Sequence, residues 1–121
     1  MDRNKLIKKL NNAFAECDTR FLADSVTDDI QWKIVGEKTI AGKEQFERSL
    51  EKMRLGGPMN ITIQDVLHTD KRSVVEGTVE YKTEPGRKKR YAFCDVYIFS
   101  DSDESKFREL RTYVSKVNKV D

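Results

Sequence analysis

The apolar positions near the start of the chain recur at helical spacing. Between Leu6 and Cys17 they return every three or four residues, with lysine, asparagine and glutamate in between. This period predicts an amphipathic helix with one buried face. Asp18 then offers a side-chain cap for a second, short helix, which we expect to carry Phe21 and Val26.

The period changes to two in the segment 30–34, where apolar residues alternate with glutamine and lysine. This alternation predicts a half-buried strand, and a turn with a short return strand at 39–41 follows it. Helical spacing resumes after Gly42 in the sequence KEQFERSLEKM. The Gly-Gly-Pro sequence that begins at Gly56 ends this third helix.

The remainder of the chain has the pattern of strands joined by polar turns. We expect strands at 60–68, 74–81, 91–99 and 107–117, with a hairpin turn at Pro85-Gly86. The third of them is apolar at nearly every position, which is typical of a central strand covered on both faces. Helices followed by a meander indicate an α+β fold rather than a parallel doubly wound sheet. We expect the helices to pack in the concave face of a curved antiparallel sheet, as the family resemblance below implies. No linker divides the chain, so we expect one domain over residues 1–121.

Composition narrows the class of protein. Charged residues make up 36% of the 121 residues, yet the net charge is only +2 and both signs are interspersed, which is untypical of a nucleic-acid-binding protein. No apolar run reaches the length of a membrane span, and the N-terminus has no signal-peptide core. Cys17 and Cys94 lie far apart, and no cysteine or histidine cluster has metal-ligand spacing. We therefore expect a cytoplasmic protein with free thiols and no metal or other cofactor.

The order of elements resembles the nuclear transport factor 2-like (cystatin-like cone) superfamily, and best its SnoaL-like, polyketide-cyclase-related branch. Four stretches carry the resemblance: FAECDTRFLADSVTDDIQWKI, GKEQFERSLEKM, VVEGTVEYKTEPGRKKRYAFCDVYIF and KFRELRTYV. The resemblance implies a sheet curled around a deep apolar pocket, and pairing of sheet faces into a homodimer. Members include isomerases, epoxide hydrolases, dehydratases, cyclases and non-enzymatic subunits, so function has to be argued from the site.

Asp95 is the most informative polar residue because it interrupts the most apolar strand. Burial should raise the pKa of its carboxyl, which would let it act as an acid, a base or a hydrogen-bond donor. In the related ketosteroid isomerases an acidic residue of the equivalent strand donates a hydrogen bond to an oxyanion. A structural alternative is an aspartate paired with Arg111 or with a buried hydroxyl.

The other residues that the related enzymes need are missing. The isomerase tyrosine would fall at Leu10 and the isomerase base near Ile34. The arginine of the epoxide hydrolases would fall at Phe93, and Glu109 is the only acid on the last strand. Neither known catalytic set is therefore assembled in this chain.

His68, the only histidine, closes a strand beside a polar turn. By analogy with scytalone-dehydratase-like sites, it could form a catalytic pair with Asp95 or Asp65. A partly solvated histidine without a catalytic role is the simpler interpretation of that position.

Aromatic residues should shape any cavity. Phe14, Trp32, Phe93 and Tyr97 are the candidate ligand-pocket residues, and Tyr97 could offer a hydroxyl inside it. A buried Trp32 would need a partner for its indole N–H. The inward face of the last strand is open: Leu110, Thr112 and Val114 fit by polarity, but a shift of one residue would turn Arg111 and Tyr113 inward.

The run Arg87-Lys88-Lys89-Arg90 follows the hairpin turn, with Glu80 on the preceding strand. A solvated strand edge with cross-strand ion pairs explains it more simply than a nucleic-acid contact.

Three functions remain open. The first is a protein that binds a small apolar ligand in a pocket with Asp95 as its polar anchor. The second is an enzyme of the cyclase, isomerase or dehydratase kind, which would act on a small apolar carbonyl compound by acid–base catalysis. The third is a non-catalytic dimeric interaction module. The missing catalytic sets favour the first and the third.

Overall fold

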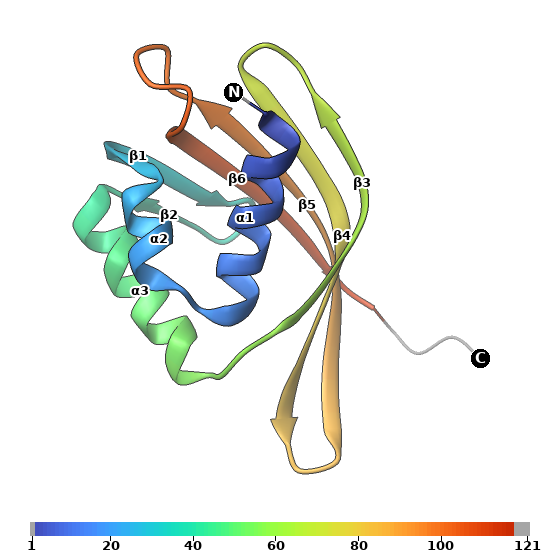
Figure 1. Ribbon diagram of the computed structural model, residues 1–121. Helices are drawn as coiled ribbons and strands as arrows, with labels where there is room; N and C mark the ends of the chain where they lie inside the picture. Colours follow the sequence, from blue (N-terminus) through green and yellow to red (C-terminus); the bar gives the residue numbers. More distant parts are fainter. Residues whose placement is uncertain (1, 118–121) are drawn as a thin grey trace.

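Three helices cover one face of a curved six-stranded sheet in the computed structural model, which describes residues 2–117 (Figure 1). All three helices lie on the concave side of the sheet, with the chain order helix, helix, two strands, helix, four strands. The predicted α+β architecture is therefore confirmed. The helices are α1 (Arg3–Glu16), α2 (Thr19–Asp24) and α3 (Lys43–Leu55). The strands are β1 (Val26–Ile34), β2 (Lys38–Ala41), β3 (Asn60–His68), β4 (Arg72–Glu84), β5 (Arg87–Phe99) and β6 (Phe107–Lys116).

Local sequence signals set the ends of the helices. The carboxylates of Asp2 and Asp18 accept hydrogen bonds from the backbone N–H groups of Lys5 in α1 and Phe21 in α2. Gly42 precedes α3 with a φ of 87°, a conformation that glycine adopts without strain. The expectation that Val26 lies on the second helix is wrong, because Val26 begins β1 and is fully buried there.

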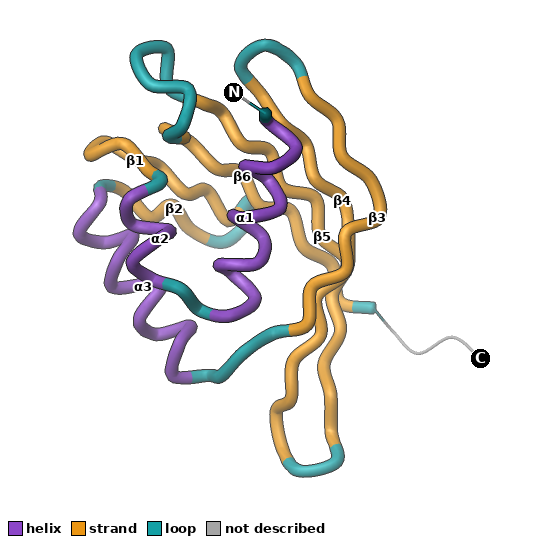
Figure 2. The backbone as a smooth tube through the Cα atoms, viewed as in Figure 1, coloured by secondary structure: helices purple, strands orange, loops and turns teal. Residues whose placement is uncertain are grey.

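The strand order in the sheet is β2-β1-β6-β5-β4-β3 (Figure 2). Four of the five neighbouring pairs are antiparallel, and the pair of β1 with β6 is parallel. The expected meander therefore holds from β3 to β6. The parallel pair arises because β6 returns to lie beside β1, from which it is far removed in sequence.

Glycine is required at one point of the bend in the sheet. Gly77 lies opposite Phe93 on β5 and Ile63 on β3. A Cβ atom at this position would lie 2.2 Å from the Thr62 carbonyl oxygen and 3.1 Å from the Phe93 ring. The strands can approach this closely because position 77 carries no side chain.

The core lies between the helices and the concave face of the sheet. Most of its aromatic pairs form edge-to-face or tilted contacts, and Tyr97 stacks on Phe99. Trp32 contacts Phe14 and Phe46, and Phe107 contacts Phe46 and Tyr97. The expectation that the strand at 91–99 is covered on both faces is wrong for most of its length, since Cys94 and Val96 on the outer face remain half-exposed.

The hairpin of β4 and β5 extends past the end of β3 as a two-stranded arm (Figure 1). The last pair between β3 and β4 joins Asn60 to Glu80, so the arm comprises residues 81–90. It carries the predicted basic run, and Lys88 forms an ion pair with Glu80 at 3.4 Å, as expected for a solvated strand edge. Among residues 2–117, no helix is long and apolar enough to cross a membrane.

Candidate functional site

A cavity of about 120 Å³ lies between the helices and the concave face of the sheet. Nine of its twelve lining side chains are hydrophobic, so its interior favours an apolar occupant. Three of the four aromatic residues that the sequence suggested line it, namely Phe14, Trp32 and Phe93. Leu110, Thr112 and Val114 also line it, which settles the inward face of the last strand.

Asp95 lies in the wall of this cavity at the centre of the sheet. On β5 it pairs with Val75 of β4 and with Thr112 of β6. Alternation along the strand turns its side chain to the same concave face as Phe93 and Tyr97. The carboxylate Oδ1 atom is fully enclosed and has no hydrogen-bond partner within residues 2–117. Such an atom is uncommon in folded proteins and calls for an explanation.

Two neighbouring side chains support the carboxyl. The indole N–H of Trp32 donates a hydrogen bond of 2.8 Å to the Thr112 hydroxyl oxygen. Thr112 lies opposite Asp95 in the β5–β6 pair, and its hydroxyl lowers the pKa of the Asp95 carboxyl. Because the indole occupies the acceptor side of Thr112, the hydroxyl proton is free to point at Asp95. Trp32 of β1 thus orients the Thr112 hydroxyl of β6, while the Asp95 Oδ1 atom has no hydrogen-bond partner among the described residues.

Burial raises the pKa of Asp95 from 3.8 to about 7, and the Thr112 hydroxyl opposes this rise. The predicted rise through desolvation is therefore confirmed. Near neutral pH the group exists in both protonation states, so it can donate or accept a hydrogen bond.

Tyr97 lies next to Asp95 on the same face, but it is not among the residues that line the cavity. Its ring is fully buried between Phe99 and Phe107, and its hydroxyl has no hydrogen-bond partner among the described residues. Burial, together with the Asp95 charge, holds the pKa of Tyr97 well above its usual value. The phenol therefore stays neutral beside the carboxyl.

His68 lies away from the cavity, at the exposed end of β3. Its Nδ1 atom lies 2.8 Å from the Ser73 hydroxyl and its Nε2 atom lies 2.6 Å from the Asn4 side-chain oxygen. Asp65 is exposed and accepts a hydrogen bond from the Val66 N–H. The structure therefore does not bring His68 to Asp95, which leaves Asp95 as the titratable side chain in the described lining of the cavity.

Arg111, one of the two structural partners considered for Asp95, is paired with another residue. Arg111 hydrogen-bonds to Glu109, which also lies 3.6 Å from the Lys33 ammonium. That ion-pair group occupies the outer face of the sheet, so Arg111 does not neutralise Asp95. The hydroxyl that does influence the carboxyl is that of the half-buried Thr112, which lowers the pKa of Asp95.

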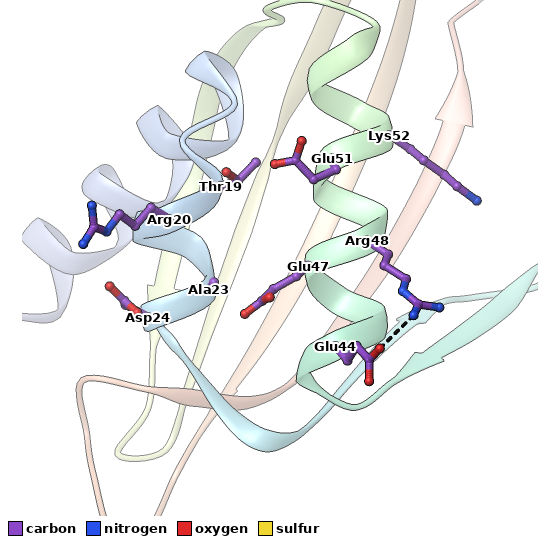
Figure 3. A pocket seen from close by; sticks show the side chains of 9 residues that line it. All are labelled: Thr19, Arg20, Ala23, Asp24, Glu44, Glu47, Arg48, Glu51 and Lys52. Atoms are coloured by element: carbon purple, nitrogen blue, oxygen red, sulfur yellow. Dashed lines mark hydrogen bonds and ion pairs between the residues drawn. The ribbon is translucent and has the colours of Figure 1, made fainter.

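A larger hollow of about 720 Å³ lies between α2 and α3 (Figure 3). Seven of its nine lining residues are exposed, and the Arg48 guanidinium forms an ion pair of 2.7 Å with Glu44 across one turn of α3. Its charges are solvated, and it holds no enclosed polar atom of the kind found at Asp95. It is a groove between two helix surfaces.

Sequence reasoning missed the roles of Thr112, Asn11 and Met59 in the cavity. Thr112 gave a partial signal through the polarity of β6, but its bond to Trp32 joins residues 80 positions apart. Asn11 lies in the apolar stripe of α1, where its buried amide donates to the Ile7 carbonyl at 2.9 Å. Met59 follows a Gly-Pro break, which hides it from any periodic pattern.

Comparison with known domains decides the family. The family model of the SnoaL-like domain matches residues 7–104, which is most of the chain. The chain belongs to the SnoaL-like family. This match confirms the expected resemblance to the nuclear transport factor 2-like superfamily. A search among curated proteins finds no match to this chain.

Solved structures share the fold at low sequence identity. A nuclear transport factor 2-like protein of unknown function from Cytophaga hutchinsonii is 21% identical, with a TM-score of 0.70 over 92% of this chain and 97% of that one. An LEH-like epoxide hydrolase from M. tuberculosis is 18% identical, with a TM-score of 0.79 over 92% and 80%. SalBIII, an epoxide hydrolase/cyclase-like enzyme in pyran ring formation in salinomycin, is 14% identical, with a TM-score of 0.80 over 93% and 90%. At these identities the likeness shows the fold of the SnoaL-like chain alone.

Proposed function

We propose that this protein binds a small apolar molecule in the cavity, with the Asp95 carboxyl as its polar anchor. The observation that carries the proposal is the enclosed Oδ1 atom of Asp95, which faces an apolar cavity without a partner from residues 2–117. A buried polar atom of this kind costs stability unless something satisfies it. A ligand with one hydrogen-bonding group beside an apolar body would satisfy it.

The size of the cavity limits the ligand. A dry cavity of about 150 Å³ accommodates benzene in another protein, and this one measures about 120 Å³. The part of the ligand inside is therefore a single ring or a short branched chain. A phenol fits the polar end, because its hydroxyl can donate to the ionised carboxyl and accept from the protonated one.

Calorimetric titration of p-ethylphenol and ethylbenzene tests the proposal, because the two compounds differ only in the hydroxyl. We expect the wild-type chain to bind p-ethylphenol. In Asp95→Leu, which keeps a side chain of similar size without its polar atoms, the preference for p-ethylphenol over ethylbenzene should fall roughly tenfold. Asp28→Asn, at an exposed aspartate of β1, serves as the control and should leave the preference unchanged.

Failure of the folded wild-type chain to bind either compound would contradict the proposal. An equal preference in the wild type and Asp95→Leu would remove Asp95 as the anchor.

A second candidate is acid–base catalysis on the bound compound, favoured by the pKa of about 7 at Asp95. Asp95 is the only titratable side chain in the described lining of the cavity. A reaction that needs two acid–base groups would therefore lack one, and binding without turnover has the stronger support. Should a substrate be found, Asp95→Asn should abolish its turnover while the chain still folds.

A further inference from the structure

One edge of the arm has no neighbouring strand among the described residues. β3 pairs with β4 only as far as Asn60 and Glu80, so residues 81–84 of β4 have β5 on one side and no strand on the other. Along an antiparallel strand, every second residue directs its N–H and C=O groups toward that open side. An edge of this kind can accept a further strand, because pairing satisfies those backbone groups.

The connector from α3 to β3 turns away from this edge. The Met59 N–H donates to the Ala15 carbonyl of α1 at 2.9 Å, which holds the connector against the helices. A hollow of about 440 Å³ lies between the connector and β4, and Tyr81 and Lys82 are among the residues that line it. From this point the arm extends past the rest of the sheet (Figure 1). An incoming strand could therefore lie where β3 would otherwise continue.

The arm is strongly basic. Residues 81–90 hold five lysines and arginines and one glutamate, a net charge of +4, whereas the whole chain has +2. Lys82 lies directly opposite Lys88, and like charges in that position destabilise a hairpin. Glu80 pairs with Lys88 at 3.4 Å, but among the described side chains neither Lys82 nor Arg90 forms an ion pair. An anionic group beside Lys82 would offset this repulsion.

The two faces of the arm differ in chemistry. Lys82 and Lys88 share one face with Arg90, because directly opposite residues and every second residue of a strand lie on the same side. The other face is aromatic, with the rings of Tyr81 and Tyr91 stacked at 5.8 Å between centroids. A strand added beside β4 would place alternate side chains beside the lysines and beside the tyrosines.

The charge of the arm disfavours a second copy of the arm as the occupant of this edge. Edge-to-edge pairing of two arms would bring two sets of lysines together, and lysine on an edge strand is a common protection against such self-pairing. An acidic strand meets the opposite situation, because a carboxylate opposite Lys82 forms a favourable cross-strand pair.

We propose that the β4 edge of the arm binds an extended acidic segment of another protein as an added strand. Acidic side chains of that segment lie beside Lys82 and Lys88, and the apolar side chains between them lie beside Tyr81. At roughly 3.3 Å per residue, residues 81–84 offer an edge of about 13 Å. A few backbone hydrogen bonds and ion pairs carry the binding, which is therefore weak. The proposal does not depend on the one made for the cavity.

Three capped seven-residue peptides test it in NMR titrations of the full chain at low salt. The first alternates valine with glutamate, the second has glutamine for each glutamate, and the third has proline for each valine. We expect the glutamate peptide to bind roughly three- to tenfold more tightly than the glutamine peptide, as exposed ion pairs allow. It should also slow hydrogen exchange at the edge amides of residues 81–84. The proline peptide keeps the charge but lacks the N–H groups of a strand, so it should leave that exchange unchanged.

Two double variants locate the charge preference. Lys82→Gln combined with Lys88→Gln should bring the ratio between the glutamate and glutamine peptides to about one. Lys5→Gln combined with Lys9→Gln removes the same charge from exposed positions of α1 and should leave the ratio unchanged.

Equal binding of the glutamate and glutamine peptides overturns the proposal, and so does a preference that survives the first double variant. Protection of residues 81–84 by the proline peptide would show that charge alone acts there, without strand pairing. Two further results would assign the edge to a different occupant and overturn the proposal. One is binding of a ten-nucleotide thymidine oligomer to the arm without binding of the glutamate peptide. The other is a change at residues 81–84 that follows protein concentration alone, as a second copy would cause.

Discussion

At the scale of single residues, burial of the Asp95 carboxyl lowers the stability of the folded chain when that carboxyl is ionised. The pKa of Asp95 is about 7 in the folded chain, against 3.8 for the free side chain. Each unit of difference corresponds to about 1.4 kcal/mol between the protonation states. The cost of ionising the carboxyl in the folded chain is therefore roughly 4 kcal/mol above pH 7.

The pH dependence of stability tests this cost. Between pH 4 and pH 7 the unfolded chain has lost the Asp95 proton and the folded chain still holds it. The free energy of unfolding contributed by Asp95 therefore falls as the pH rises through this window, and stays constant above it. Asp95→Asn removes the titration, so its stability relative to the wild type should increase by roughly 3 kcal/mol from pH 4 to pH 7.

Urea denaturation at a series of pH values measures this difference. Asp28→Asn, at an exposed position, provides the control for the loss of one carboxylate. A difference between Asp95→Asn and the wild type that is flat over the same range would show that Asp95 ionises normally.

At the scale of elements, the first turn of α1 is attached to the turn between β3 and β4. The Arg3 guanidinium lies 4.2 Å from the centre of the Phe99 ring and donates to the Asp70 carbonyl at 2.9 Å and to the Ser73 hydroxyl at 3.3 Å. His68 adds a second link, because its ring bridges Ser73 and Asn4. This attachment places α1, which carries Asn11 and Phe14, over the cavity.

Arg3→Ala should therefore lower the free energy of unfolding by about 1–2 kcal/mol, since it removes a cation–π contact and charged hydrogen bonds at a partly exposed site. Arg20→Ala, at an exposed position on α2, should change it by less than about 0.5 kcal/mol. Chemical denaturation of the two variants gives the comparison, and amide hydrogen exchange should speed up in the first turn of α1 only in Arg3→Ala. Equal effects of the two substitutions would show that the attachment does not stabilise the fold.

At the scale of the whole molecule, local periodicity was sufficient for the element order and the α+β class, while the family resemblance implied the curved sheet with helices on one side. Most of the helices and strands bury a stripe that the sequence displays directly, and Asp95 was recognisable as a polar interruption of such a stripe. The parallel pairing of β1 with β6, by contrast, depends on contacts between distant segments. The same holds for the hydrogen bond of Trp32 to Thr112 and for the position of Met59 in the cavity wall, which no local pattern contains.

The outer face of the sheet bears on how copies of the chain associate. It carries exposed apolar side chains, among them Leu67 and Tyr113, next to the half-exposed Cys94 and Val96. The homodimer expected from the family resemblance stays a prediction, and this face is the surface on which it would form.

The central claim is that Asp95 is a buried carboxyl that contacts a ligand in the cavity. Its most direct test is an NMR titration of the carbon-13-labelled aspartate carboxyls, without ligand and with p-ethylphenol. We predict one carboxyl resonance, assigned by its loss in Asp95→Asn, with a midpoint near pH 7 and a clear displacement when p-ethylphenol is added. A midpoint near pH 4 for that resonance, together with no displacement by the phenol, would contradict the account.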